Sequence, residues 1–153
     1  IGAFYNFIAF ASAFALIPLA RRFGARNLHG LCLACGGLAI LAIPQISQVQ
    51  WLFVAMLGLG ISWASMMGNT YAILSRPLPQ GKTGIFMGIF NLFIVIPMMI
   101  QSLTMPLIYE PLLAGYAPNA ISLAGVLLLL AGASVVLIRG DQQSQSVLAE
   151  DAR

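Results

Sequence analysis

Polar side chains that could bind a small molecule are found within two otherwise apolar stretches. In residues 51–74, Ser62, Ser65 and Asn69 fall within an arc of about 60° when the residues are placed 100° apart around a helix. Polar residues are costly inside a membrane and usually face a cavity or another helix. Hydroxyl and amide groups at this spacing therefore predict one face that could exchange hydrogen bonds with the hydroxyls of a substrate.

A second polar face is expected in residues 85–109. Asn91 and Gln101 lie within about 80° of each other around a helix, and Pro97 interrupts the hydrogen-bond ladder between them. Interrupted helices commonly mark transporter binding sites. Tight helix contact is the alternative role for polar and small residues, and we favour it for Gly84 and Gly88. For the amides, both roles stay open.

Trp63 lies beside the first polar face and has a ring suited to a sugar. The axial C–H face of a sugar can stack on an aromatic ring while its hydroxyls pair with amides. Aromatic residues in membranes also serve as packing residues or interface anchors. The substrate-binding, cavity-lining residues predicted from both stretches are Ser62, Trp63, Ser65, Asn69, Asn91 and Gln101.

Other reactive residue types do not form a recognisable catalytic or metal-binding pattern. There is no Ser/His/Asp set, no pair of carboxylates within an apolar stretch and no phosphate-binding glycine loop. We expect neither an enzyme nor a bound cofactor or metal. Cys32 and Cys35 have no obvious ligand partners and are interpreted as small packing residues. His29 is interpreted as a solvated histidine at the mouth of a span, with a proton relay as the alternative.

The composition places these residues in a membrane. Hydrophobic residues make up 60% of the chain, charged residues only 7%, and the mean hydropathy is +0.94, whereas soluble domains carry about 25% charged residues. The pattern lacks the period-two alternation of a barrel, so the expected fold is an all-α membrane protein. The predicted helical bundle covers residues 1–138, and 139–153 is expected to be a disordered cytoplasmic tail. The five expected spans are residues 1–20, 28–46, 51–74, 85–109 and 120–138.

The basic residues predict how the chain is oriented. All seven lie in alternate connections between spans or in the tail, and the opposite connections hold no Lys or Arg. By the positive-inside rule the C-terminus is cytoplasmic. This pattern accounts for the net charge of +3 without a nucleic-acid partner. Because the chain begins within an apolar run and without a methionine, we expect further spans before it.

Residues 60–97 carry a resemblance to a known family. The stretches Gly60–Leu74 and Ile85–Pro97, and within the latter Gly-Ile-Phe-Asn ending at Asn91 and Ile-Val-Ile-Pro ending at Pro97, resemble the glycoside:cation symporters. This group of the major facilitator superfamily includes plant sucrose and animal proton-coupled sugar transporters. A weaker resemblance is to the superfamily's Asp-Arg-x-Gly-Arg-Arg loop, of which Arg22, Gly24 and Arg26 match.

This sequence departs from both patterns at single positions. Arg21 replaces the acid of the loop motif and Ala25 replaces one of its arginines, which puts the charge relay proposed for that loop in doubt. Thr70 stands where the family's proline is expected.

The resemblance implies that the spans are helices 8 to 12 of a twelve-helix fold in a plasma or bacterial inner membrane. Helix 10 would line the cavity, and helices 9 and 12 would be peripheral. The implied function is transport of a disaccharide or glucoside by alternating access. The implied partners are the sugar, a coupling proton or sodium ion, the lipid bilayer and a missing N-terminal half. The coupling residue is expected outside this chain. The alternatives are a facilitator that exports drugs or lipids and a non-transporting scaffold subunit.

Overall fold

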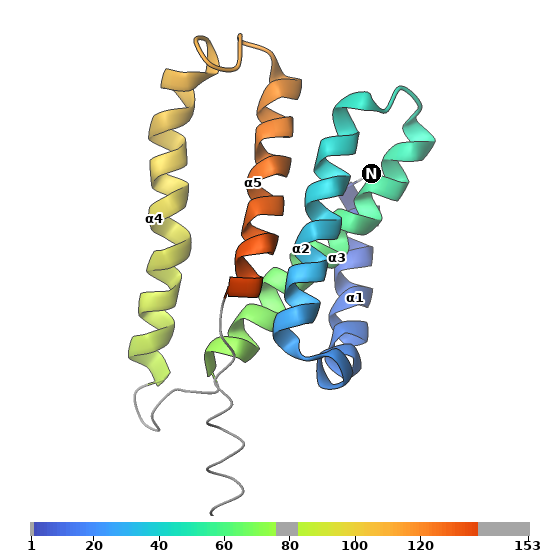
Figure 1. Cartoon of the computed structure of the whole chain (residues 1–153), viewed down its shortest axis with the longest axis vertical. Coiled ribbons are helices and arrows are strands. Elements are labelled where there is room, and N and C mark those ends of the chain that lie inside the picture. Colours follow the sequence, from blue (N-terminus) through green and yellow to red (C-terminus); the bar gives the residue numbers. More distant parts are fainter. Residues whose placement is uncertain (1, 76–82, 138–153) are drawn as a thin grey trace, which may run out of the picture.

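A computed structural model describes residues 2–75 and 83–137, except the side chains of 69, 71–75, 83, 136 and 137. The tail predicted for residues 139–153 and the basic residues Arg76 and Lys82 lie outside the described part. Five long helices and one 3₁₀ turn make up the described chain (Figure 1): α1 (Gly2–Phe23), α2 (Ala25–Ala42), η1 (Ile43–Gln45), α3 (Val49–Ser75), α4 (Thr83–Tyr109) and α5 (Ala117–Leu137). All five long helices are long and apolar enough to cross a membrane, which confirms the predicted all-α class.

The connection between α1 and α2 is much shorter than the sequence suggested. A loop was expected over residues 21–27, but only Gly24 separates the two helices. Gly24 has a φ of 82°, which glycine adopts without the steric cost that a Cβ would add. Its carbonyl accepts a hydrogen bond from the Leu28 amide at 3.1 Å, closing the first turn of α2. Arg21 and Arg22 therefore lie in the last turn of α1, where the helix dipole favours cations.

Helix α2 is the central helix of the described bundle. It packs against α3 on one side and α5 on the other, with a smaller contact to α1, and α1 packs on α3 (Figure 1). The family resemblance implied a peripheral position for this span. Among the described residues α2 lies between α3 and α5, and its position in a twelve-helix fold stays a prediction.

The contact between α2 and α5 is made at matched pairs of glycines. A Cβ added at Gly37 would lie 3.1 Å from the carbonyl oxygen of Gly125, and one at Gly30 would lie 3.4 Å from that of Gly132. The pairs run in opposite directions along the two helices, so the helices are antiparallel. In lipid, helix association depends on close packing rather than on apolar burial, and small residues allow the backbones to approach. These glycines explain why two apolar helices associate.

Helix α4 stands apart from the other helices. None of its spanning segment is buried within the chain, and it lies beside α5 in Figure 1. A Cβ at Gly84 or Gly88 would meet nothing within 4 Å, so the described residues make no tight contact at these two glycines, and the predicted contact stays a prediction. The helix is also continuous from Thr83 to Tyr109 despite Pro97 and Pro106.

Candidate functional site

The two predicted serines of α3 face α2. Ser62 is 1% exposed and Ser65 is fully buried. The Ser65 hydroxyl lies 2.9 Å from Nδ1 of His29 on α2. The Ser62 hydroxyl has no hydrogen-bond partner among the described residues, and it packs where Gly36 leaves room for it. Both hydroxyls therefore belong to the α2–α3 contact in the described chain.

His29 is not the solvated loop residue that we expected. Because α2 begins at Ala25, His29 lies within the helix and is partly buried. Cys32, one turn further along α2, is also close to the Ser65 side chain. It is buried in a small core with Leu16 and Leu28. The sequence analysis treated His29 and Cys32 separately, although a spacing of three residues places them on one side of a helix.

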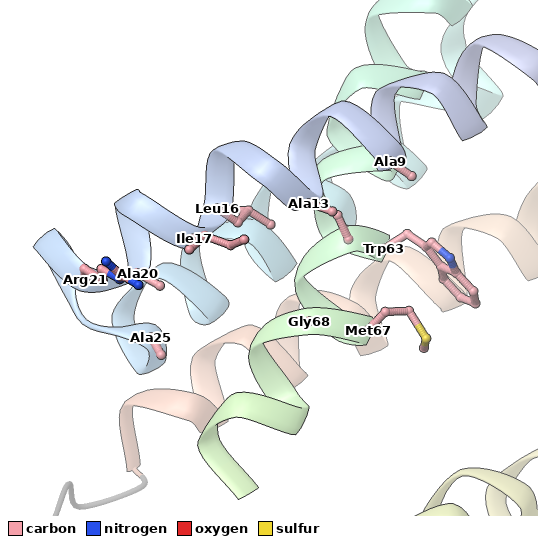
Figure 2. Close-up of a pocket in the computed structure, with 11 residues that line it drawn as sticks. Ala9, Ala13, Leu16, Ile17, Ala20, Arg21, Ala25, Trp63, Met67 and Gly68 are labelled. Atoms are coloured by element: carbon pink, nitrogen blue, oxygen red, sulfur yellow. The ribbon is translucent and has the colours of Figure 1, made fainter. Parts of the chain in front are cut away.

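Trp63 lies on another side of α3, beside an open cavity. Its side chain is 46% exposed, and it borders a cavity of about 550 Å³ between α1 and α3. Figure 2 shows Arg21 and Ala25 at one end of this cavity and Trp63 towards the other. The cavity is lined by Ala9, Ala13, Leu16, Ile17, Ala20, Arg21, Ala25, Trp63, Ala64, Met67 and Gly68.

The shape of this cavity follows from where α1 and α3 touch. A Cβ at Gly60 would lie 2.7 Å from the Ile8 side chain and 3.1 Å from the Ala9 backbone nitrogen, so the helices are in close contact there. Two turns further along α3, a Cβ at Gly68 would meet nothing within 4 Å. The space between the helices is therefore open near Gly68, where small alanine side chains on α1 do not fill it.

The two predicted amides of α4 lie elsewhere. Gln101 is exposed and borders a cavity of about 620 Å³ between α4 and α5. Thr104 is the other polar residue lining that cavity, and the remaining lining is apolar. Asn91 is exposed on α4. The side chain of Asn69 lies outside the described ones.

The described residues thus do not gather the six predicted residues into one site. Two serines lie in a helix contact, Trp63 borders one cavity and Gln101 borders another. Sequence reasoning missed Arg21 as a lining residue, because it treated the residue as part of a loop. Alanines at positions 9, 13 and 20, followed by this arginine, were the available signal, since they recur at helical spacing on one face of α1.

Comparisons with protein-family models, curated proteins and solved structures find no match to this chain.

Proposed function

We propose that the chain is part of a secondary transporter that moves a disaccharide or glucoside together with a proton or sodium ion. The observation that supports this proposal best is the exposed indole of Trp63 beside the α1–α3 cavity. Small-molecule sites are mostly apolar concavities of about 300–1,000 Å³ with a few polar groups. A cavity of this size with one tryptophan in its wall offers a surface on which a sugar ring can stack.

We assign a second set of substrate contacts to α4, which does not border the Trp63 cavity in the described chain. Asn91 and Gln101 are both exposed on a helix apolar enough to span a membrane. Polar residues on a membrane-spanning helix usually face protein or a water-filled cavity. We infer that further helices of the same transporter lie against α4 and that the substrate binds between them and this chain. In this arrangement the five spans correspond to helices 8 to 12, and the C-terminus is cytoplasmic.

The test is sugar exchange by the full-length protein in proteoliposomes, measured with Trp63→Ala and with Trp51→Ala as the matched control. Both tryptophans lie on α3 and both are exposed, but only Trp63 borders the α1–α3 cavity. Loss of a stacking surface should weaken apparent affinity for the sugar by roughly 5- to 30-fold in Trp63→Ala, as expected for about 1–2 kcal/mol. Trp51→Ala should leave it unchanged.

The α4 assignment is tested in the same assay. Asn91→Ala should weaken apparent affinity by roughly 5- to 100-fold, because a substrate hydroxyl would lose its partner. Asn6→Ala is the control, since its exposed amide donates to the Gly2 carbonyl of its own helix and has no other partner in residues 2–75 and 83–137. A wild-type protein that exchanges no sugar would overturn the proposed function. Unchanged affinity in both Trp63→Ala and Asn91→Ala would overturn the site.

The lining of the α1–α3 cavity favours a second candidate function. Apart from Arg21 and the indole nitrogen of Trp63, the cavity presents only apolar side chains. An amphiphilic anion would place its charge at Arg21 and its apolar part along the alanines, as expected for an exporter of drugs or lipids. An Arg21→Gln variant that loses transport of such an anion while wild type moves no sugar would support this second candidate.

A further inference from the structure

The His29–Ser65 pair joins two helices through a group that can bind a proton. It connects α2 to α3 with a separation of 2.9 Å between Nδ1 and the hydroxyl oxygen. Histidine is the side chain whose ordinary titration falls near neutral pH. Ser65 is completely buried, so its hydroxyl cannot exchange this partner for bulk water while the helices stay in contact. The link therefore depends on the protonation state of one imidazole.

No negatively charged side chain on the described helices could stabilise a protonated His29. On its own helix it has Arg26, Cys32 and Cys35, and α1 carries only Arg21, Arg22 and Tyr5. Helix α5 carries no titratable side chain, and the only one on α3 is Tyr71, whose side chain is outside those described. No carboxylate lies on any of the described helices. Protonation would thus place a cation in a low-dielectric contact without an anion, which is strongly unfavourable.

Protonation also affects the serine. If the Ser65 hydroxyl donates to Nδ1 of the neutral ring, a proton on Nδ1 turns that nitrogen into a donor, and the hydroxyl hydrogen must then find another acceptor. If Nδ1 already donates, the new proton goes to Nε2 and the ring becomes a partly buried cation. In both cases the closed contact then holds a partly buried imidazolium without an anion, which disfavours it, and separation of the helices would let water reach the ring.

We propose that His29 is a proton-binding site that controls the contact between α2 and α3: the neutral ring holds α3 through Ser65, and protonation loosens it. The effect has a definite sign, because the protected contact is present at high pH and is lost as pH falls. This inference goes beyond the proposed transport and does not depend on it. If protons drive transport, His29 is the group in the described chain through which they would change helix packing.

Cys32 provides a native reporter of this contact. It is 3% exposed, lies one turn from His29 and is close to Ser65. In the full-length protein with every other cysteine replaced, its modification by dithiodipyridine can be followed at about pH 5.5 and about pH 8, on either side of the ordinary imidazole range. His29→Gln is the matched variant, because glutamine can still bond to Ser65 but does not titrate. Dividing each wild-type rate by the His29→Gln rate at the same pH removes the intrinsic pH dependence of the thiol.

The rate ratio should be near one at the higher pH and rise roughly 3- to 10-fold at the lower pH, which corresponds to a contact weakened by about 0.7–1.4 kcal/mol. A ratio that stays at one at both pH values would overturn the proposal. Ser65→Ala gives an independent test, since it removes the bond and keeps the imidazole. Cys32 should then react rapidly at the higher pH already, and protection equal to wild type would show that the bond does not hold the contact.

Discussion

Helices α3 and α4 have the same length and similar apolar composition, yet they are used differently in the described chain. Each has 27 residues, but 28% of the spanning segment of α3 is buried within the chain and none of that of α4 is. The polar residues of α3 that are buried are serines, and those exposed on α4 include amides. Small hydroxyl side chains fit between close helices and can return a hydrogen bond to their own backbone. Amides are larger, and we assign those of α4 to a surface that other helices or substrate cover.

The largest effect is expected where helices touch through glycine. In Gly37→Ala, the new Cβ would lie 2.7 Å from the Leu129 side chain and 3.1 Å from the Gly125 carbonyl oxygen. Because a backbone carbonyl cannot move aside easily, the substitution should destabilise the protein by about 1–3 kcal/mol, measured as thermal unfolding in detergent. Gly88→Ala is the matched control on α4. Its Cβ would meet nothing within 4 Å, so stability should stay the same or rise by up to about 1 kcal/mol.

An equal loss of stability in Gly88→Ala would break the contrast between the two helices, because it would mean that α4 is packed tightly at that position in the full-length protein.

A smaller effect is expected for the serine that holds His29. Ser65→Ala removes the only partner shown for the imidazole and should lower stability by about 0.6–2 kcal/mol. Ser134→Ala is the control, since its exposed hydroxyl donates to the Ala131 carbonyl of its own helix at 2.7 Å. Thermal unfolding of both variants near neutral pH is the measurement. If the two variants unfold alike, the link between α2 and α3 does not contribute to stability.

The smallest effect is expected for the neighbouring serine. The Ser62 hydroxyl is buried without a hydrogen-bond partner among the described residues, so Ser62→Ala removes a desolvated polar group and no bond. Stability should change by less than about 0.5 kcal/mol or increase slightly. A loss as large as that of Ser65→Ala in the same unfolding assay would show that Ser62 has a partner in the full-length protein.

The number and class of the helices could be predicted from the sequence because hydropathy and length determine both in a membrane. The neighbour that each side chain faces, whether another helix or a cavity, could not be predicted in this way. The arc through Ser62 and Ser65 gives a direction around one helix axis, but it does not say whether α2, α4 or a cavity is found in that direction. Trp63 was correctly placed on another face than the serines. The α1–α3 cavity was missed because it depends on the separation of two helices, which the close contact at Gly60 controls.

The residues at which α1 ends and α2 begins were also predicted wrongly, and this affected the interpretation of individual residues. Positive charge at residues 21–26 suggested a loop, so Arg21 was not considered as a cavity residue, and His29 was interpreted as solvated because the span was expected to begin at residue 28. In the structure the charges are carried on helix ends. A single glycine with positive φ was sufficient for the turn, and a conformation of that kind cannot be read from hydropathy.

The one-residue connection at Gly24 also bears on how the chain enters a bilayer. With only Gly24 between them, the end of α1 and the start of α2 must lie at the same membrane surface, and Arg21, Arg22 and Arg26 lie there together. Moving arginines across the bilayer centre is costly. The three arginines are therefore expected to keep this turn on the side from which insertion starts, whichever of the two helices crosses first.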